Sequence, residues 1–174
     1  FTLVACSVDY TPKPRAYFKL FLPEKHYTAI DAGCNFTFEV PEYSKVIMKN
    51  DHCFLNVAFP KQNAVLHITY LPLADNLYEH TEQSRSLAYK HDVIADAISE
   101  QVYINEENSV YGMLYDYDGL TATAAQFFLT DSINHFFRGA LYFNTEVNDS
   151  LIPVNNFLKQ DVRHLIESFR WIDK

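Results

Sequence analysis

The chain has 174 residues, 48% hydrophobic and 21% charged, a balance that suits one folded domain rather than a disordered tail or a membrane bundle. Fourteen Lys and Arg against 22 Asp and Glu give a formal net charge of −8. This charge argues against sequence-independent binding of nucleic acid, because such binding needs clustered cations. Only four Gly occur, and no dinucleotide, P-loop, zinc-protease or serine-hydrolase motif is present. We therefore expect no nucleic-acid partner and no cofactor.

The first residues match the end of a bacterial lipoprotein signal peptide. Leu3-Val4-Ala5-Cys6 places apolar residues and then a small residue directly before a cysteine, which is the pattern of a lipobox. We expect residues 1–5 to be a signal-peptide remnant and Cys6 to carry lipid through its sulfur. The alternative is a short buried first strand that ends in an ordinary cysteine.

The segment after this cysteine predicts an extended tether. Residues 6–15 place Pro12 and Pro14 among polar residues, and such segments stay extended. No other stretch approaches the ~18 consecutive apolar residues of a membrane-spanning helix. We expect attachment to the membrane through lipid, with residues 16–174 forming a single domain that the tether holds off the surface.

The two remaining cysteines, Cys34 and Cys53, lie 19 positions apart. An exported protein sits in an oxidising compartment, where an even pair of cysteines predicts a disulfide. Closing a loop of this size would stabilise the fold by about 3 kcal/mol. The alternative is two buried free thiols. A zinc site needs more ligands than Cys53 and the neighbouring His52 supply, so we expect no metal.

Apolar and alternating runs predict strands in the first half of the domain. They lie at 16–22, 36–40, 45–48, 54–59 and 64–71. Residues 75–90 lack Pro and Gly and are rich in helix formers, which predicts a helix with Asp75 or Asn76 as its N-cap.

Four more strands are predicted after this helix. They lie at 98–104, 110–117, 121–129 and 134–143. Asp118-Gly119 favours a two-residue hairpin loop between the second and third, and residues 130–132 are expected to form the next turn. Consecutive hairpins predict an antiparallel meander. Because 136–143 is largely apolar at both parities, we expect both faces of that strand to be covered.

The last element is predicted to be a helix with an apolar stripe. From Val154, apolar residues recur at 157, 158, 162, 165, 166 and 169, and Pro153 suits the first turn. The other face is expected to be polar, with Asn156, Lys159, Gln160, Arg163 and Glu167. The predicted fold class is α+β: a mostly antiparallel β-sheet covered by helices on its faces, with a long C-terminal amphipathic helix.

Candidate catalytic groups are sparse. Asp116 and Asp118 flank Tyr117 and could form a carboxylate pair, but the adjacent turn explains both residues by turn chemistry. His164 falls on the polar side of the last helix, where we expect it to be solvated. The other histidines form no metal-binding or catalytic spacing, so we expect no catalytic residues and a protein that is not an enzyme.

Sequence blocks in order along nearly the whole chain resemble the gliding-motility lipoprotein GldD family of Bacteroidetes. The blocks include Asp9-Tyr10-Thr11-Pro12-Lys13-Pro14-Arg15 after Cys6, Phe36-Thr37-Phe38-Glu39 and Arg85-Ser86-Leu87-Ala88-Tyr89-Lys90-His91. The most distinctive are Gln126-Phe127-Phe128-Leu129-Thr130-Asp131-Ser132 and His135-Phe136-Phe137-Arg138-Gly139-Ala140-Leu141-Tyr142-Phe143-Asn144.

The resemblance implies a cell-envelope lipoprotein required for gliding motility, a process linked to type IX secretion. It implies lipid at Cys6 and partners among the other envelope proteins of gliding and secretion. The tether lacks the acidic run of surface-exported lipoproteins, so we expect an outer-membrane protein that faces the periplasm.

At the level of fold, the element order is similar to the PsbP/Mog1-like sandwich of non-catalytic accessory proteins. Fold analogy does not establish function. The leading hypothesis is a non-catalytic accessory component of the gliding and secretion apparatus. The alternative is a periplasm-facing lipoprotein that binds a small ligand or glycan.

Overall fold

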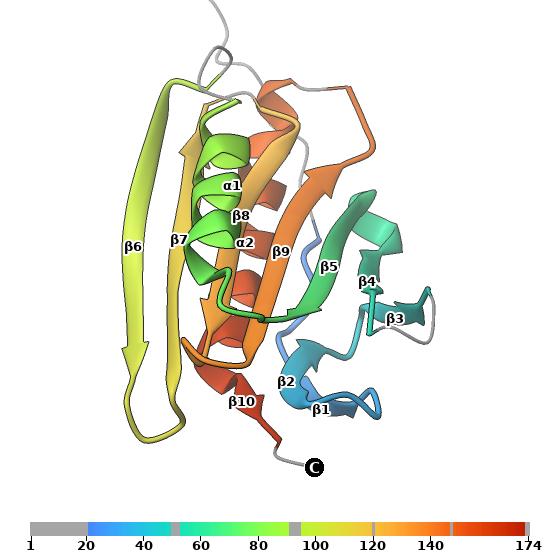
Figure 1. Ribbon diagram of the computed structural model, residues 1–174. Coiled ribbons are helices and arrows are strands. Elements are labelled where there is room, and N and C mark those ends of the chain that lie inside the picture. The colour runs from blue at the N-terminus through green and yellow to red at the C-terminus, as the bar shows by residue number, and fades with distance from the viewer. Residues whose placement is uncertain (1–20, 50–52, 91–94, 120, 147, 173–174) are drawn as a thin grey trace, which may run out of the picture.

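The computed structural model describes residues 21–49, 53–90, 95–119, 121–146 and 148–172 (Figure 1). Within them, ten strands form two sheets, and every strand pairing is antiparallel. The strands are β1 (Tyr27–Asp31), β2 (Phe36–Pro41), β3 (Lys45–Met48), β4 (Leu55–Phe59), β5 (Ala64–Pro72), β6 (Ala97–Asn105), β7 (Val110–Asp118), β8 (Thr123–Thr130), β9 (His135–Phe143) and β10 (Arg170–Trp171). The helices are α1 (Leu77–Tyr89) and α2 (Ile152–Ser168), with short 3-10 turns at Pro60–Gln62 and Asp149–Leu151.

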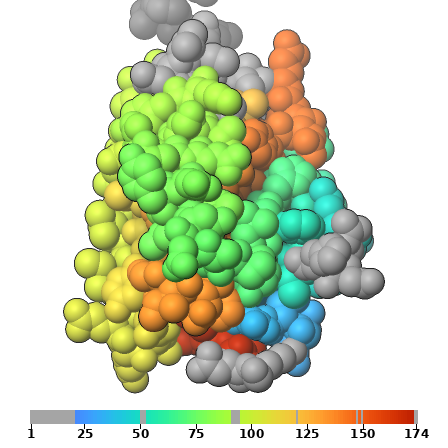
Figure 2. All heavy atoms as spheres, viewed as in Figure 1, coloured from blue at the N-terminus to red at the C-terminus, as the bar shows by residue number. Residues whose placement is uncertain are grey.

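The large sheet has the strand order β3-β4-β5-β9-β8-β7-β6, and the small sheet has the order β1-β2-β10. Helix α1 covers one face of the large sheet over β8 and β9 (Figures 1 and 2). Helix α2 lies on the opposite face and also packs against β2. The predicted α+β class with a mostly antiparallel sheet and helices on both faces is therefore confirmed.

Strand β9 has buried aromatic side chains on both faces of the large sheet. Phe136 stacks on Phe128 and contacts His80 of α1, whereas Phe137 packs edge-on against Phe36 and lies beside Phe169. Successive side chains of a strand point to opposite faces, so each phenylalanine enters a different layer. Both are buried, which confirms the prediction of two covered faces for this strand.

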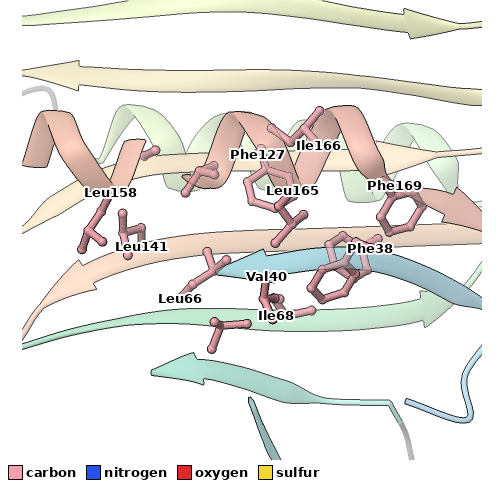
Figure 3. Close-up of a cluster of buried hydrophobic side chains, with 14 of the residues drawn as sticks. Phe38, Val40, Leu66, Ile68, Phe127, Leu141, Leu158, Leu165, Ile166 and Phe169 are labelled. Atoms are coloured by element: carbon pink, nitrogen blue, oxygen red, sulfur yellow. The ribbon is translucent and has the colours of Figure 1, made fainter. Parts of the chain in front are cut away.

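The main core lies between α2 and the large sheet (Figure 3). Its labelled members come from α2 and the residue after it, from the sheet and from β2, and each is less than 5% exposed: Leu158, Leu165, Ile166, Phe169, Leu66, Ile68, Phe127, Leu141, Phe38 and Val40. Burial of an aliphatic or aromatic side chain contributes about 1.5–3 kcal/mol, so this layer is the largest favourable contribution to the fold.

The predicted hairpin between β7 and β8 is present, but its loop is longer than predicted. β7 ends at Asp118 and β8 begins at Thr123. The last residues of β7 pair with β6 rather than with β8, and the Asp96 N–H donates to the Asp118 carbonyl oxygen at 3.0 Å. Because the last residues of β7 pair with β6 only, β8 begins farther along the chain than a two-residue loop would allow.

Strands β1 and β10 were not predicted. β1 is an edge strand with exposed Thr28 and Ala29, so it has no apolar run. β10 is only two residues long and follows α2 almost directly. Both depend on pairing with β2, which a local pattern does not reveal. The strand predicted at 16–22 falls mostly outside the described residues, and Phe21 and Leu22 are in no strand.

Candidate functional site

Of the predicted site residues, only the two later cysteines are described. Cys6 and the tether at 6–15 lie outside the described residues. A disulfide joins Cys34 and Cys53, whose Cα atoms are 5.9 Å apart. Cys34 precedes β2 of the small sheet and Cys53 precedes β4 of the large sheet. The bond therefore ties the two sheets together at the start of these strands.

Asp161, in the middle of α2, is the centre of a buried polar cluster. Its side chain is 2% exposed, and Lys25 Nζ lies 2.5 Å from its Oδ1. The Tyr27 hydroxyl donates to the same oxygen at 2.8 Å, and the Tyr43 hydroxyl donates to Oδ2. Lys25 also donates to the Phe157 carbonyl oxygen at 2.8 Å. These contacts fasten the segment before β1 and the loop after β2 to the helix.

The surroundings keep the two tyrosines of this cluster protonated. Burial and then the hydrogen bond to Asp161 raise the pKa of both Tyr27 and Tyr43 above the ordinary tyrosine value. The hydroxyls therefore remain protonated donors at neutral pH. With an ammonium group and two hydroxyls on its oxygens, the carboxylate is occupied as an acceptor.

His164 is not solvated as predicted. Its Nε2 lies 2.6 Å from Glu39 Oε2 on β2, and its ring stacks on Tyr27 with 3.5 Å between ring centroids. The small sheet packs on this side of α2, which the helical pattern alone could not show. The side chain is 32% exposed, so it lies at the rim of the Asp161 cluster.

The prediction of a uniformly polar outer face on α2 is wrong at Lys159. Its side chain is 6% exposed, and Nζ lies 2.5 Å from Asp116 Oδ1 and donates to the Tyr117 carbonyl oxygen at 2.6 Å. Arg163 bonds the other oxygen of Asp116. Asp118 lies farther off, 3.6 Å from Lys159 Nζ. Turn chemistry therefore does not explain Asp116, which is part of an ion-pair cluster between β7 and α2.

These two clusters hold α2 from both sides. One joins the helix to the small sheet and its flanking segments, and the other joins it to β7. Charges removed from water are tolerated when they are paired and hydrogen-bonded. Both oxygens of Asp161 accept hydrogen bonds, whereas Asp116 accepts one from Arg163 on Oδ2 and pairs with Lys159 through Oδ1. Within the residues that the structure describes, no group of three or more His, Cys, Asp or Glu could hold a metal ion. The arrangement is suited to fixing the helix against its neighbours.

An open hollow of about 360 Å³ lies where β9, β10 and the β6–β7 turn meet. His135 and Trp171 line it and stack with 5.1 Å between ring centroids. The Tyr70 hydroxyl lies 2.7 Å from His135 Nδ1, and Trp171 Nε1 donates to the Ser109 carbonyl oxygen at 3.1 Å. These bonds hold an aromatic platform at the wall of the hollow.

Asp131 supplies a fixed negative charge to the same hollow. Its Oδ1 accepts backbone N–H bonds from Ile133, Asn134 and His135 at 2.8–3.0 Å. Burial would raise its pKa, but the three N–H donors outweigh that effect and hold the pKa of Asp131 below its ordinary value. The same bonds shape the predicted turn between β8 and β9.

One of the missed residues carried a detectable signal. Asp161 lies three residues after Leu158 and four before Leu165, inside the apolar stripe of the last helix. A carboxylate at such a position predicts a buried partner. The sequence gives no comparable sign that Lys159 is buried, because its burial depends on the end of β7 packing against α2.

The fold and its site define the class of the protein: an α+β domain of two antiparallel sheets fastened to one helix by buried polar clusters. No helix among the described residues is long and apolar enough to cross a membrane. Residues 7–171 match the family model of the gliding motility lipoprotein GldD, so the chain belongs to this family and the resemblance is confirmed. A lipoprotein family implies a lipid-anchored protein of the cell envelope. The comparison with curated proteins found no match.

Proposed function

We propose that this protein is a non-catalytic accessory component of the gliding and type IX secretion apparatus of Bacteroidetes. Cys6 anchors it in the outer membrane, residues 7–15 space it from the bilayer, and the folded domain faces the periplasm. There it contacts other envelope proteins of the apparatus. The family match over residues 7–171 supports the motility role.

The observation that carries the non-catalytic part of the proposal is the pairing of the charges on α2. Asp161 is occupied by Lys25, Tyr27 and Tyr43, and Asp116 by Lys159 and Arg163. A general base needs an oxygen or nitrogen that can reach a substrate proton, and these carboxylates are already bound by donors. The clusters support a rigid domain that presents its outer surfaces to partners.

The experiment that tests this role is a clean deletion of the gene in its host. Colony spreading and secretion of a type IX cargo are measured, and the strain is complemented with wild type and with Cys6→Ala. We expect both phenotypes to be lost and only wild type to restore them. Normal spreading and secretion in the deletion strain would contradict the proposal. Full rescue by Cys6→Ala would contradict the anchoring step.

The second candidate function, binding of a small ligand or glycan, is favoured by the hollow beside Trp171 and His135. Aromatic rings with nearby polar groups suit a sugar ring, which offers an apolar face and hydroxyls. The core beneath α2 is filled by Leu158, Val162 and Leu165, so a ligand would use this open hollow rather than an enclosed cavity.

Trp171 is the single tryptophan of the chain, so its fluorescence reports directly on this hollow. Titration with soluble peptidoglycan fragments should change its emission in a saturable way if glycan binding is the function. His135→Ala removes the stacked partner and should abolish the change, whereas His67→Ala, distant in the chain and on β5, should not. An unchanged emission up to millimolar fragment would count against this candidate.

A further inference from the structure

Strand β6 forms one edge of the large sheet along its full length. Its nine residues pair with β7 from Ala97 opposite Asp118 to Asn105 opposite Val110, without a register shift. In the part of the chain that the structure describes, no strand pairs with the other side of β6. The strand runs along the free margin of the sheet, beside the area covered by α1 (Figures 1 and 2). Alternate residues of such an edge turn their N–H and C=O groups away from the sheet.

This edge carries few of the devices that usually prevent strand addition. Natural edges are blunted by Pro, by charged side chains and above all by lysine, by bulges or by short length. Residues 96–110 contain no Pro, Lys or Arg, and the charged residue within β6 is Glu100. The opposite edge strand of the same sheet, β3, is four residues long and begins with Lys45. The two edges of one sheet therefore differ in how open they are to another strand.

One face of β6 is apolar towards the C-terminal end of the strand. Val102 and Ile104 are 61% and 67% exposed. Both share the face of Glu100, which accepts a hydrogen bond from Tyr89 of α1 at 2.8 Å, so this is the face that α1 only partly covers. The half-buried Met113 and Tyr111 are their partners on β7 and extend the apolar surface inward. Apolar side chains of an added strand would continue this surface outward.

The other face of β6 borders a hollow of about 180 Å³ next to α2. Tyr103 and Asn105 line it from the strand, and Ile166 and Glu167 line it from the helix. Glu167 is exposed, as are Glu106 and Glu107 in the turn beyond β6. An added strand would therefore meet Val102 and Ile104 beside Glu100 on one face, and Glu167 on the other.

A second copy of this chain fits this edge poorly. Antiparallel pairing of two β6 strands centred on Gln101 would place Asp96 opposite Glu106 of the other copy at both ends. Like charges directly opposite each other destabilise a strand pair. The net charge of −8 adds to this repulsion. A partner with the opposite charge does not meet these costs.

We propose that β6 is a strand-addition site for an extended segment of a partner protein that alternates apolar with basic residues. Its backbone pairs with the free edge of β6, its apolar side chains cover Val102 and Ile104, and a lysine or arginine faces Glu167. This is β-augmentation, in which main-chain bonds supply affinity and alternate side chains supply specificity. The proposed accessory role supplies the context, but the test below does not use motility, so either proposal can fail separately.

The test is an NMR titration of the ¹⁵N-labelled 174-residue chain with a nonapeptide of alternating isoleucine and lysine. We expect shift changes concentrated in residues 97–105 and slower amide exchange at alternate residues of that strand. A peptide of the same sequence that is N-methylated at every residue carries the same charge but has no backbone N–H to donate on either edge, so it cannot extend the ladder. It should bind at least about tenfold more weakly, because main-chain bonds provide the affinity.

Two variants locate the site. Val102→Lys with Ile104→Lys places positive charge on the edge and should weaken peptide binding about tenfold, since like charges across a strand pair repel. Ile47→Lys, on the opposite edge strand and 49% exposed, is the matched control and should leave binding unchanged.

Three outcomes would overturn the proposal: equal binding of the N-methylated peptide, shift changes away from β6, or an equal loss of binding with Ile47→Lys. Concentration-dependent shift changes at β6 without peptide would assign the edge to a second copy instead. The N-methylated comparison uses only the wild-type chain, so it decides the question even if a variant fails to fold.

Discussion

Lys159 Nζ lies 2.5 Å from Asp116 Oδ1, and the two side chains, from α2 and β7, are 6% and 13% exposed. Burying this ion pair away from water costs free energy. Removing one of its partners costs more, because the remaining charge stays buried without a counter-charge. The same reasoning applies to Asp161 and Lys25 on the other side of α2. The helix is therefore sensitive to the loss of single charges at these positions.

We expect Lys159→Met to lower the free energy of unfolding by about 3 kcal/mol, the lower end for a broken buried pair, because Arg163 still bonds Asp116. Urea denaturation measures this loss. Gln160→Met, at the exposed neighbouring position, is the matched control and should change stability little. The double variant Lys159→Met/Asp116→Leu should recover part of the loss. A single variant as stable as wild type would show that the pair does not hold the helix.

The tyrosines on Asp161 predict sensitivity to alkaline pH. Burial and the hydrogen bond to Asp161 raise the pKa of Tyr43 and Tyr27 above 10.0, so the folded state holds protons that the unfolded state releases. This contribution to stability is complete below about pH 10 and is lost as the pH rises towards the folded pKa. Melting temperatures recorded from about pH 8 to about pH 11.5 should fall steeply at the upper end.

Tyr43→Phe distinguishes the ionisation of Tyr43 from other causes of alkaline unfolding. It should cost about 1.5–3 kcal/mol at neutral pH, from the lost hydrogen bond to a charged group, and should make the alkaline decline shallower. Tyr78→Phe, on a side chain that is 77% exposed, is the control and should change neither quantity. An unchanged alkaline slope in Tyr43→Phe would contradict the assignment.

Asp131 predicts a sensitivity of the opposite sign, at acid pH. Because three backbone N–H donors outweigh burial, its folded pKa lies below 3.8, and the unfolded state binds the proton first. Its contribution to stability is present above the unfolded pKa and is lost as the pH falls through the folded pKa. Asp131→Asn should cost about 1–3 kcal/mol at neutral pH, because it weakens hydrogen bonds to a charge, and should remove this acid component. Urea midpoints measured across the acid range test it, with exposed Glu42→Gln as control.

The disulfide between Cys34 and Cys53 should stabilise the domain by about 3 kcal/mol, since it closes a loop of 19 positions. Cys34→Ala/Cys53→Ala should lower the denaturant midpoint accordingly. Reductant should shift wild type to the same midpoint and leave the double variant unchanged. Identical midpoints for oxidised and reduced wild type would mean that the bond adds no stability.

The regular elements could be predicted because their patterns are local. Strand β5 alternates apolar and polar residues over 64–71, and the structure extends it by one residue to Pro72. Strand β3 has its predicted ends, Lys45 and Met48. The length of the β7–β8 loop could not be predicted from Asp118-Gly119. It depends on whether the last residues of β7 pair with β6 or with β8.

Eight of the ten described strands, the two helices, the family and the cysteine pair could be predicted from residue patterns alone, because periodicity and residue order are local properties of the chain. The tertiary structure alone decided where the buried charges find their partners. Lys25 and Asp161 are 136 positions apart, and no spacing rule joins them. Their contact exists because the small sheet folds onto α2, and the burial of a charge depends on every layer around it rather than on its neighbours in sequence.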